Sequence, residues 1–220
     1  GFINGFVVAK CRINPLITTL ATMQMVKGFG LVISHSNSVP DYEPHFTKLG
    51  LGAFPAIYDA AGAPIFRISV PVWVCIGCFL LFGLVLQWTT FGRDTLAIGG
   101  NEEAARLAGV PVDRIKIIIF TVEGVIAALA GILLMARSGS MQQDSSQGLE
   151  LQVIAACVLG GVSLTGGVGR MSFVIAGVFI MGVVENAMSL EQVAPSYRYL
   201  VSGGILLAAV LVDRLKQRHA

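Results

Sequence analysis

The sequence predicts an all-α integral membrane protein, a polytopic helical bundle. Two observations predict this class. Only 13% of the 220 residues are charged and 55% are hydrophobic, whereas an average soluble domain carries about 25% charged residues. The apolar residues also come in long runs, and a helix needs about 20 such residues to cross a bilayer. We therefore expect about six full spans and the end of one more, within a single transmembrane domain over residues 1–220.

The first apolar run covers residues 1–9 and is closed by Lys10 and Arg12, as the end of a span would be. Because the chain starts inside an apolar run and without a methionine, we expect that N-terminal spans are missing from it. A full span is predicted over residues 13–33. It begins near Pro15, and proline is tolerated in the first turn of a helix.

Residues 34–68 are polar and contain four of the eight prolines, which predicts an extracytoplasmic loop. The next span, over residues 69–88, has Trp73 and Trp88 near its two ends, and tryptophan is enriched at both membrane interfaces. Residues 89–114 are polar again and predict a second loop.

Four further spans are predicted after this loop, over residues 115–136, 151–169, 171–189 and 197–212. The segment 151–169 is apolar but rich in glycine, so it either crosses fully or re-enters on one side. Basic residues favour the full crossing. Cytoplasmic loops of membrane proteins carry an excess of Lys and Arg. If the loop 89–114 is cytoplasmic and residues 151–169 cross fully, ten of the fifteen Lys and Arg residues lie on the cytoplasmic side.

A short helix is predicted over residues 102–108, inside the second loop. Asn101 can cap its N-terminus, and Glu102 and Glu103 fall in the first turn, where the helix dipole favours negative charge. Gly109 can adopt the left-handed conformation that ends a helix. Isolated helices of fewer than about 12 residues are marginal in water, so this one needs a partner and is predicted to be a docking element.

Residues 103–109 spell E-A-A-x-x-x-G and resemble the permease subunits of ATP-binding-cassette (ABC) importers, whose cytoplasmic loop carries this pattern. The longer pattern continues with an isoleucine, matched by Ile119, and a Leu-Pro pair that this chain lacks. Residues 148–167 resemble, over about twenty positions, the permeases for monosaccharides of the ribose, arabinose, galactose and xylose group. A connecting helix in another transporter is the alternative for the loop, and static helix packing is the alternative for the glycines.

The resemblance implies a homodimeric pore made with a second permease copy in the bacterial inner (plasma) membrane. It implies two cytoplasmic ABC ATPase subunits and a periplasmic sugar-binding protein that delivers the substrate. ATP and magnesium would bind to the partner ATPase, so no cofactor is expected in this chain. The expected cargo is a monosaccharide, L-arabinose or a related pentose or hexose.

The residues expected to couple the permease to its ATPase lie on and beside the short helix. Ala104, Leu107 and Ala108 share one face at the i, i+3, i+4 spacing and leave room for close docking. The full set of coupling candidates is Asn101, Glu102, Glu103, Ala104, Arg106, Leu107 and Gly109.

Ionisable groups inside membrane spans are costly and need a reason. Glu123 lies about two turns into its span, where it would line a sugar pathway or pair structurally with another helix. The full set of pathway candidates is Glu123, Glu150, Gly160, Gly161, Ser163 and Asn186.

Two other functional classes are weighed against the importer. A proton-coupled secondary transporter of a small polar solute would use Glu123 as its proton carrier. A membrane enzyme is disfavoured because a catalytic constellation is missing, since no histidine lies within the spans to serve as the base of a Ser-His hydrolase. The chain also lacks a phosphate-binding loop, so it is not expected to be the ATPase itself. Cys75 and Cys78 form C-x-x-C, but no second pair or nearby histidine completes a metal site, so no metal is expected and both are read as packing residues. The absence of a basic patch with interleaved aromatic residues argues against a nucleic-acid partner.

Overall fold

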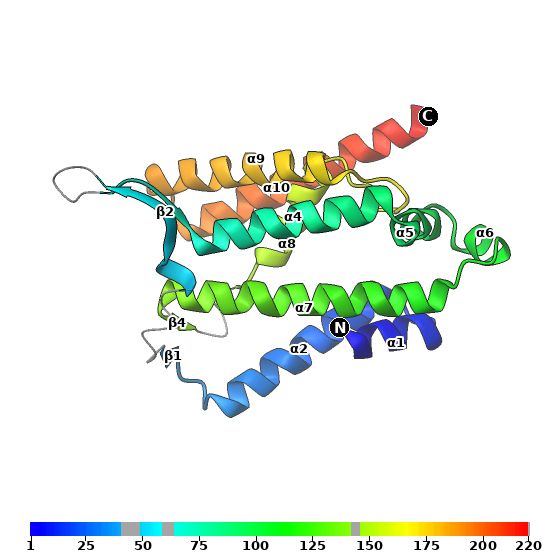
Figure 1. Ribbon diagram of the computed structural model, residues 1–220, viewed down its shortest axis with the longest axis horizontal. Coiled ribbons are helices and arrows are strands. Elements are labelled where there is room, and N and C mark those ends of the chain that lie inside the picture. The colour runs from blue at the N-terminus through cyan, green and yellow to red at the C-terminus, as the bar shows by residue number, and fades with distance from the viewer. Residues whose placement is uncertain (41–48, 59–63, 142–145, 220) are drawn as a thin grey trace. The chain divides into compact units, whose positions relative to one another are not determined.

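The computed structural model describes residues 1–40, 49–58, 64–141 and 146–219 (Figure 1). The chain divides into two compact units, the first made of residues 1–78 and 111–145 and the second of residues 79–110 and 146–220. The helix α4 (Val70–Trp88) contributes to both. The predicted all-α class is confirmed, because the described strands are few and short.

In the described residues the first unit is built on three whole helices, part of α4 and two small strand pairs. Its elements are α1 (Phe2–Lys10), α2 (Pro15–Ile33), β1 (Val39–Pro40), β2 (Ala53–Tyr58), β3 (Pro64–Ser69), α7 (Val112–Ser138) and β4 (Ser140–Met141). Asn14 caps α2, since its side-chain oxygen accepts a hydrogen bond of 2.8 Å from the amide of Leu16, and Pro15 occupies the first turn as predicted.

Helix α1 runs antiparallel to α7 and packs closely against it. A methyl group added to Gly5 would lie 2.8 Å from the Cα of Ile117. At the other end of α1, the Lys10 ammonium is 3.1 Å from the Asp113 carboxylate in the first turn of α7. The C-terminal end of α1 and the start of α7 therefore lie together (Figure 1).

The predicted loop over residues 34–68 contains a hairpin that sequence analysis did not predict. Strands β2 and β3 pair antiparallel, with Ala56 opposite Arg67, and the register shifts between Ala53 and Ala56. Pro55 falls in that shift, where a strand tolerates a residue without an amide donor. The indole of Trp73 in α4 donates a hydrogen bond to the carbonyl of Phe54 and ties the hairpin to the helix.

The second unit holds the C-terminal helices. Its elements besides part of α4 are α5 (Thr90–Gly100), α6 (Glu102–Leu107), α8 (Leu149–Leu159), α9 (Met171–Leu190) and α10 (Pro195–His219). The buried core of this unit forms where α8 meets α9 and α10. Ala155 and Ala156 of α8 pack with Met181 of α9, and Ile205 and Leu206 of α10 cover them.

In the part of the chain that the structure describes, four helices are long and apolar enough to cross a membrane, namely α2, α4, α7 and α9. They correspond to four of the six predicted full spans. The predicted span 197–212 lies inside the longer helix α10, whose apolar portion is Tyr197–Leu211. The remaining predicted span, over residues 151–169, is matched only by the shorter apolar helix α8.

Residues 151–169 do not form a continuous spanning helix. Helix α8 ends at Leu159, and 11 residues rise only about 16 Å, against a hydrocarbon thickness of about 30 Å. Gly161 has a φ of 73°, a left-handed conformation that an α-helix cannot contain. Residues 160–170 are turns and irregular backbone.

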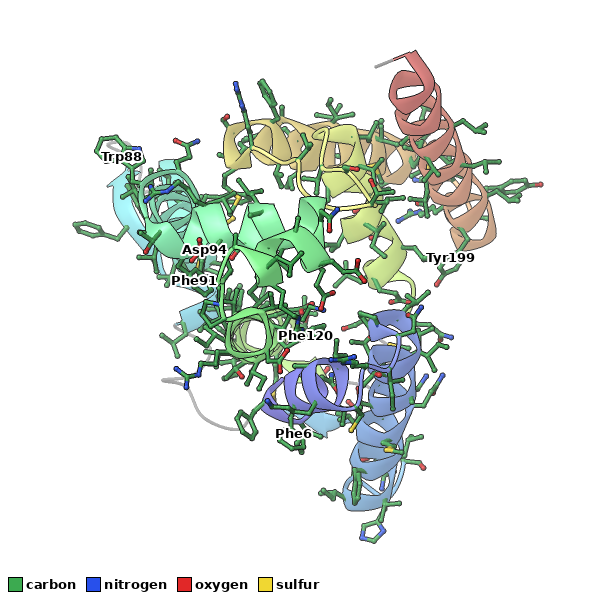
Figure 2. All side chains as sticks on the ribbon, turned by 90° about the vertical axis from the view of Figure 1, so that its right-hand side faces the viewer. Phe6, Trp88, Phe91, Asp94, Phe120 and Tyr199 are labelled. Carbon is green, nitrogen blue, oxygen red and sulfur yellow. The ribbon has the colours of Figure 1, made fainter. Side chains whose placement is uncertain are left out.

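The two ends of this broken segment nevertheless lie near opposite ends of α9. A methyl group on Gly148, just before α8, would lie 2.9 Å from the ring of Tyr199. Tyr199, near the start of α10, is labelled in Figure 2. A methyl group on Gly160 would lie 2.7 Å from the Cα of Val174, near the start of α9. The segment therefore runs antiparallel to α9, as a short helix followed by irregular backbone, and its full crossing of the membrane stays a prediction.

Candidate functional site

The predicted cytoplasmic loop contains two helices rather than one. Thr89 caps the first, α5, because its hydroxyl oxygen accepts a hydrogen bond of 3.1 Å from the amide of Gly92. Sequence analysis missed α5 and read its residues as loop. The available signal was Thr89 itself, a residue type favoured at helix N-caps, followed by a stretch without proline.

The second helix is the predicted docking element. Helix α6 covers residues 102–107, one residue shorter than predicted. Asn101 has extended backbone, and its side-chain oxygen accepts a hydrogen bond of 3.0 Å from the amide of Ala104, which confirms the predicted cap. Glu102 and Glu103 occupy the first turn as predicted. Arg106 lies 3.4 Å from Glu102 in an i,i+4 ion pair on the helix surface.

The C-terminus of α6 is closed by a left-handed glycine. Gly109 has a φ of 87°, and its amide donates to the carbonyl of Arg106 at 3.1 Å. The amide of Val110 donates to the carbonyl of Ala105, also at 3.1 Å. A methyl group on Gly109 would meet nothing within 4 Å, so backbone conformation, rather than crowding, accounts for glycine at this position.

The two sides of α6 differ sharply in burial. Ala105 is buried. Leu107 is 90% exposed, and Ala104 and Ala108 are exposed beside it. The apolar face predicted for docking therefore points away from the chain, with one large apolar side chain flanked by two small ones.

The glycine-rich segment after α8 folds into a compact turn. The amide of Ser163 donates to the carbonyl of Val168 at 3.0 Å, and the amide of Gly166 donates to the carbonyl of Ser163 at 3.1 Å. The hydroxyl of Ser163 lies 2.8 Å from that of Thr165. Ser163 thus shapes the turn, and a role for it in the sugar pathway stays a prediction.

The other pathway candidates belong to different elements. Glu123 is exposed on α7 in the first unit, whereas the remaining candidates belong to the second. Glu150 is exposed in the first turn of α8, and Asn186 is exposed near the end of α9. Gly160 is buried and Gly161 exposed. Their assignment to a pathway stays a prediction.

Metal chemistry finds no support in the described residues, where no group of three or more His, Cys, Asp or Glu side chains could hold an ion. The four cysteines are free thiols. The candidate functional site thus consists of the capped helix α6 and the glycine-rich turn after α8.

Comparison with known proteins connects these features to a protein family. The family described as branched-chain amino acid transport system / permease component matches residues 1–210. The L-arabinose transport system permease protein AraH of Escherichia coli (strain K12) is 53% identical over 216 residues, which cover 98% of this chain and 62% of that protein.

Two further relatives are similar over the same extent. The L-arabinose ABC transporter permease protein AraH of Azospirillum brasilense is 48% identical over 100% of this chain and 62% of its own length. The ribose import permease protein RbsC of Bacillus subtilis (strain 168) is 38% identical over 97% of this chain and 63% of its own length. The chain thus spans about three fifths of the length of these relatives. No solved structure matches it.

Proposed function

Because this chain belongs to the family of branched-chain amino acid transport system permease components, we propose that it forms part of the membrane subunit of an ATP-driven importer for a monosaccharide. The family and the four membrane-length helices make it a multi-pass membrane protein. It is a transport permease rather than an enzyme. The relatives that carry sugar names support the predicted resemblance to monosaccharide permeases, and they do not support the proton-coupled alternative.

The observation that carries the proposed mechanism is helix α6. This helix has six residues and a cap at each end, and its Leu107 side chain is 90% exposed. These features suit a helix that docks on a partner protein. A large apolar side chain in water gains free energy when a partner buries it. The partner that fits an importer is a cytoplasmic ATPase subunit with a cleft that receives α6.

The proposed cycle is alternating access. When ATP and magnesium bind to the ATPase pair, the two ATPase subunits close and carry α6 with them. The spans then rearrange, and the pathway opens to the opposite face of the membrane. Within this cycle the chain breaks no bond, because it transmits movement and lines the pathway.

The proposed assembly contains two permease copies, two ATPase subunits and a periplasmic sugar-binding protein in a bacterial inner membrane. The proposed substrate is L-arabinose or a related pentose or hexose, since the relatives named for L-arabinose are 53% and 48% identical and the relative named for ribose is 38% identical. A pentose and a hexose can differ by one CH₂OH group, so the binding protein would contribute much of the selection.

Reconstitution tests the proposal directly. The permease, its ATPase and its binding protein are placed in liposomes, and uptake of arabinose, ribose, galactose and xylose is measured with and without ATP. We expect uptake that requires both ATP and the ATPase, with arabinose transported fastest. Uptake that persists without the ATPase and collapses with an uncoupler would instead establish the proton-coupled alternative.

A further inference from the structure

Glycines of two distant segments meet in the second unit, Gly99 and Gly100 of α5 on one side and Gly166 and Gly167 of the turn on the other. A methyl group on Gly99, in the last turn of α5, would be forced against the amide nitrogen of Gly167 and would lie 3.3 Å from the carbonyl carbon of Gly166. Seen from the other segment, a methyl group on Gly166 would lie 2.6 Å from the carbonyl oxygen of Gly99 and 3.0 Å from its Cα. The two backbones therefore touch directly, with no side chain between them.

Direct backbone contact makes this junction stiff. A long side chain between two segments can change rotamer and so absorb a small displacement. Glycine has no side chain, so a displacement of one backbone acts directly on the other. Gly166 and Gly167 also have φ values of 92° and 77°, which only glycine adopts at little cost. Packed contacts of this kind switch between discrete arrangements instead of deforming smoothly.

The junction also has a particular position in the chain. Gly99 lies two residues before Asn101, the cap of α6, so one side of the contact is connected to the docking helix by a single residue. On the other side, Gly166 and Gly167 belong to the turn that follows α8 and precedes the start of α9 at Met171. The contact thus links the docking helix to the break between α8 and α9.

We propose that this glycine junction, made of Gly99, Gly166 and Gly167, is the joint through which displacement of α6 reaches the broken segment after α8. The inference rests on the proposed function, in which an ATPase moves α6. Movement of α6 pulls the end of α5, and the end of α5 displaces the turn against which it is packed. The turn then shifts the C-terminus of α8 and the first turn of α9 together.

The chain provides a matched pair of variants. Gly99→Ala places a methyl group into the backbone of the turn. Gly100→Ala places the same methyl group one residue further along α5. The Cα of Gly100 lies 2.7 Å from where a methyl group on Gly167 would be, but a methyl group on Gly100 itself would meet nothing within 4 Å. Both changes replace glycine by alanine in the last turn of the same helix, so their effects on helix propensity are similar. They differ in whether the junction can remain closed.

The decisive quantity is the amount of sugar imported per ATP hydrolysed, measured in liposomes that contain the whole permease, its ATPase and its binding protein. For Gly99→Ala we expect this ratio to fall about tenfold, within the range that typical coupling free energies between sites produce, while the ATPase still binds. For Gly100→Ala the ratio should match that of the unsubstituted permease. An unchanged ratio in Gly99→Ala would overturn the joint.

Failure of the joint and failure of the proposed function are distinguishable in this experiment. If neither the unsubstituted permease nor Gly100→Ala imports sugar with ATP, the proposed function is wrong. If both import and Gly99→Ala imports equally well per ATP, only the joint is wrong.

A second measurement covers the case in which Gly99→Ala does not assemble. A fluorophore is attached to Val168→Cys, whose native side chain is 66% exposed on the turn, after the four native cysteines have been replaced by alanine. In the permease with Gly99 intact, adding the ATPase with a non-hydrolysable ATP analogue should change the emission of the label. No change would overturn the joint. In an assembled Gly99→Ala permease the change should be smaller.

Discussion

The exposed leucine of α6 allows the docking proposal to be tested as a binding free energy. Leu107 is 90% exposed in the isolated chain, so nearly all of its side chain is available for burial in a partner. Leu107→Ala removes three carbon atoms. At about 0.8 kcal/mol per buried CH₂ group the full loss is roughly 2.4 kcal/mol, and incomplete burial reduces it to about 2 kcal/mol.

This free energy converts into an affinity that is easy to measure. Because about 1.4 kcal/mol corresponds to a tenfold change, the dissociation constant between the permease and its ATPase should rise about thirtyfold in Leu107→Ala. The assay is a titration of the ATPase onto permease held in nanodiscs, at one fixed nucleotide concentration. Alanine is at least as good a helix former as leucine, so α6 itself should persist.

The control is another largely exposed leucine of the second unit. Leu190, at the end of α9, is 77% exposed and is predicted to lie on the opposite side of the membrane from α6. Leu190→Ala should leave the dissociation constant unchanged. The docking argument is refuted if Leu107→Ala changes the constant no more than Leu190→Ala does.

Three further predictions concern glycines and one ion pair. Gly109→Val should weaken ATPase binding in the same titration, because a left-handed backbone costs an ordinary residue about 1–2 kcal/mol, whereas Gly109→Asn should retain more affinity. Equal affinities of these two variants would contradict the role of φ. Gly177→Val should lower the free energy of unfolding in mixed micelles by about 1–3 kcal/mol, because the new side chain would press on the Ala156 carbonyl. The control Gly182→Val occupies open space, and an equal loss in both would disprove close α8–α9 packing. Lys10→Ala should lower the free energy of unfolding by less than about 1 kcal/mol in the same assay, because the side chains of Lys10 and Asp113 in this ion pair are 54% and 28% exposed. A loss of several kcal/mol would show that this pair is a major stabilising contact.

Helix α6 was predictable to within one residue because its determinants are local. The cap at Asn101 and the left-handed Gly109 act through hydrogen bonds to residues at most five positions away. Signals of this range are present in the sequence itself. The long spans were predictable for a different reason, since apolar composition over about 20 residues suffices to mark them.

The break after α8 was not predictable from hydropathy. Residues 151–169 have the apolar composition of a span, and hydropathy sums side chains without registering backbone conformation. Their helix stops because Gly160 packs against the backbone of α9 and Gly161 turns left-handed. The contact of Gly160 depends on α9, which follows later in the sequence. The left-handed Gly161 is a local signal like Gly109, because its amide donates to the carbonyl of Val158 and the next amide to that of Cys157.

The contact between Gly99 and Gly166 is a second feature that depends on segments far apart in the sequence. Glycine in both segments was visible in the sequence, but nothing local indicates that residues 67 positions apart would touch. The pathway candidates have this problem too. Sequence identifies Glu123 and Asn186 as polar groups within apolar runs, yet it cannot state which neighbours they face.

The irregular backbone after α8 also limits what can surround this part of the protein. Acyl chains offer no hydrogen bonds, so backbone outside a helix or closed sheet is not stable when it faces them. The turn bonds partly within itself, yet the side chains of Leu164 and Val168 are 55% and 66% exposed. If this turn lies at membrane depth, its outer side must meet water or another protein chain. The annulus of lipid around the permease would then be interrupted at this point, and detergent that replaces lipid would cover α4 and α9 but not the turn.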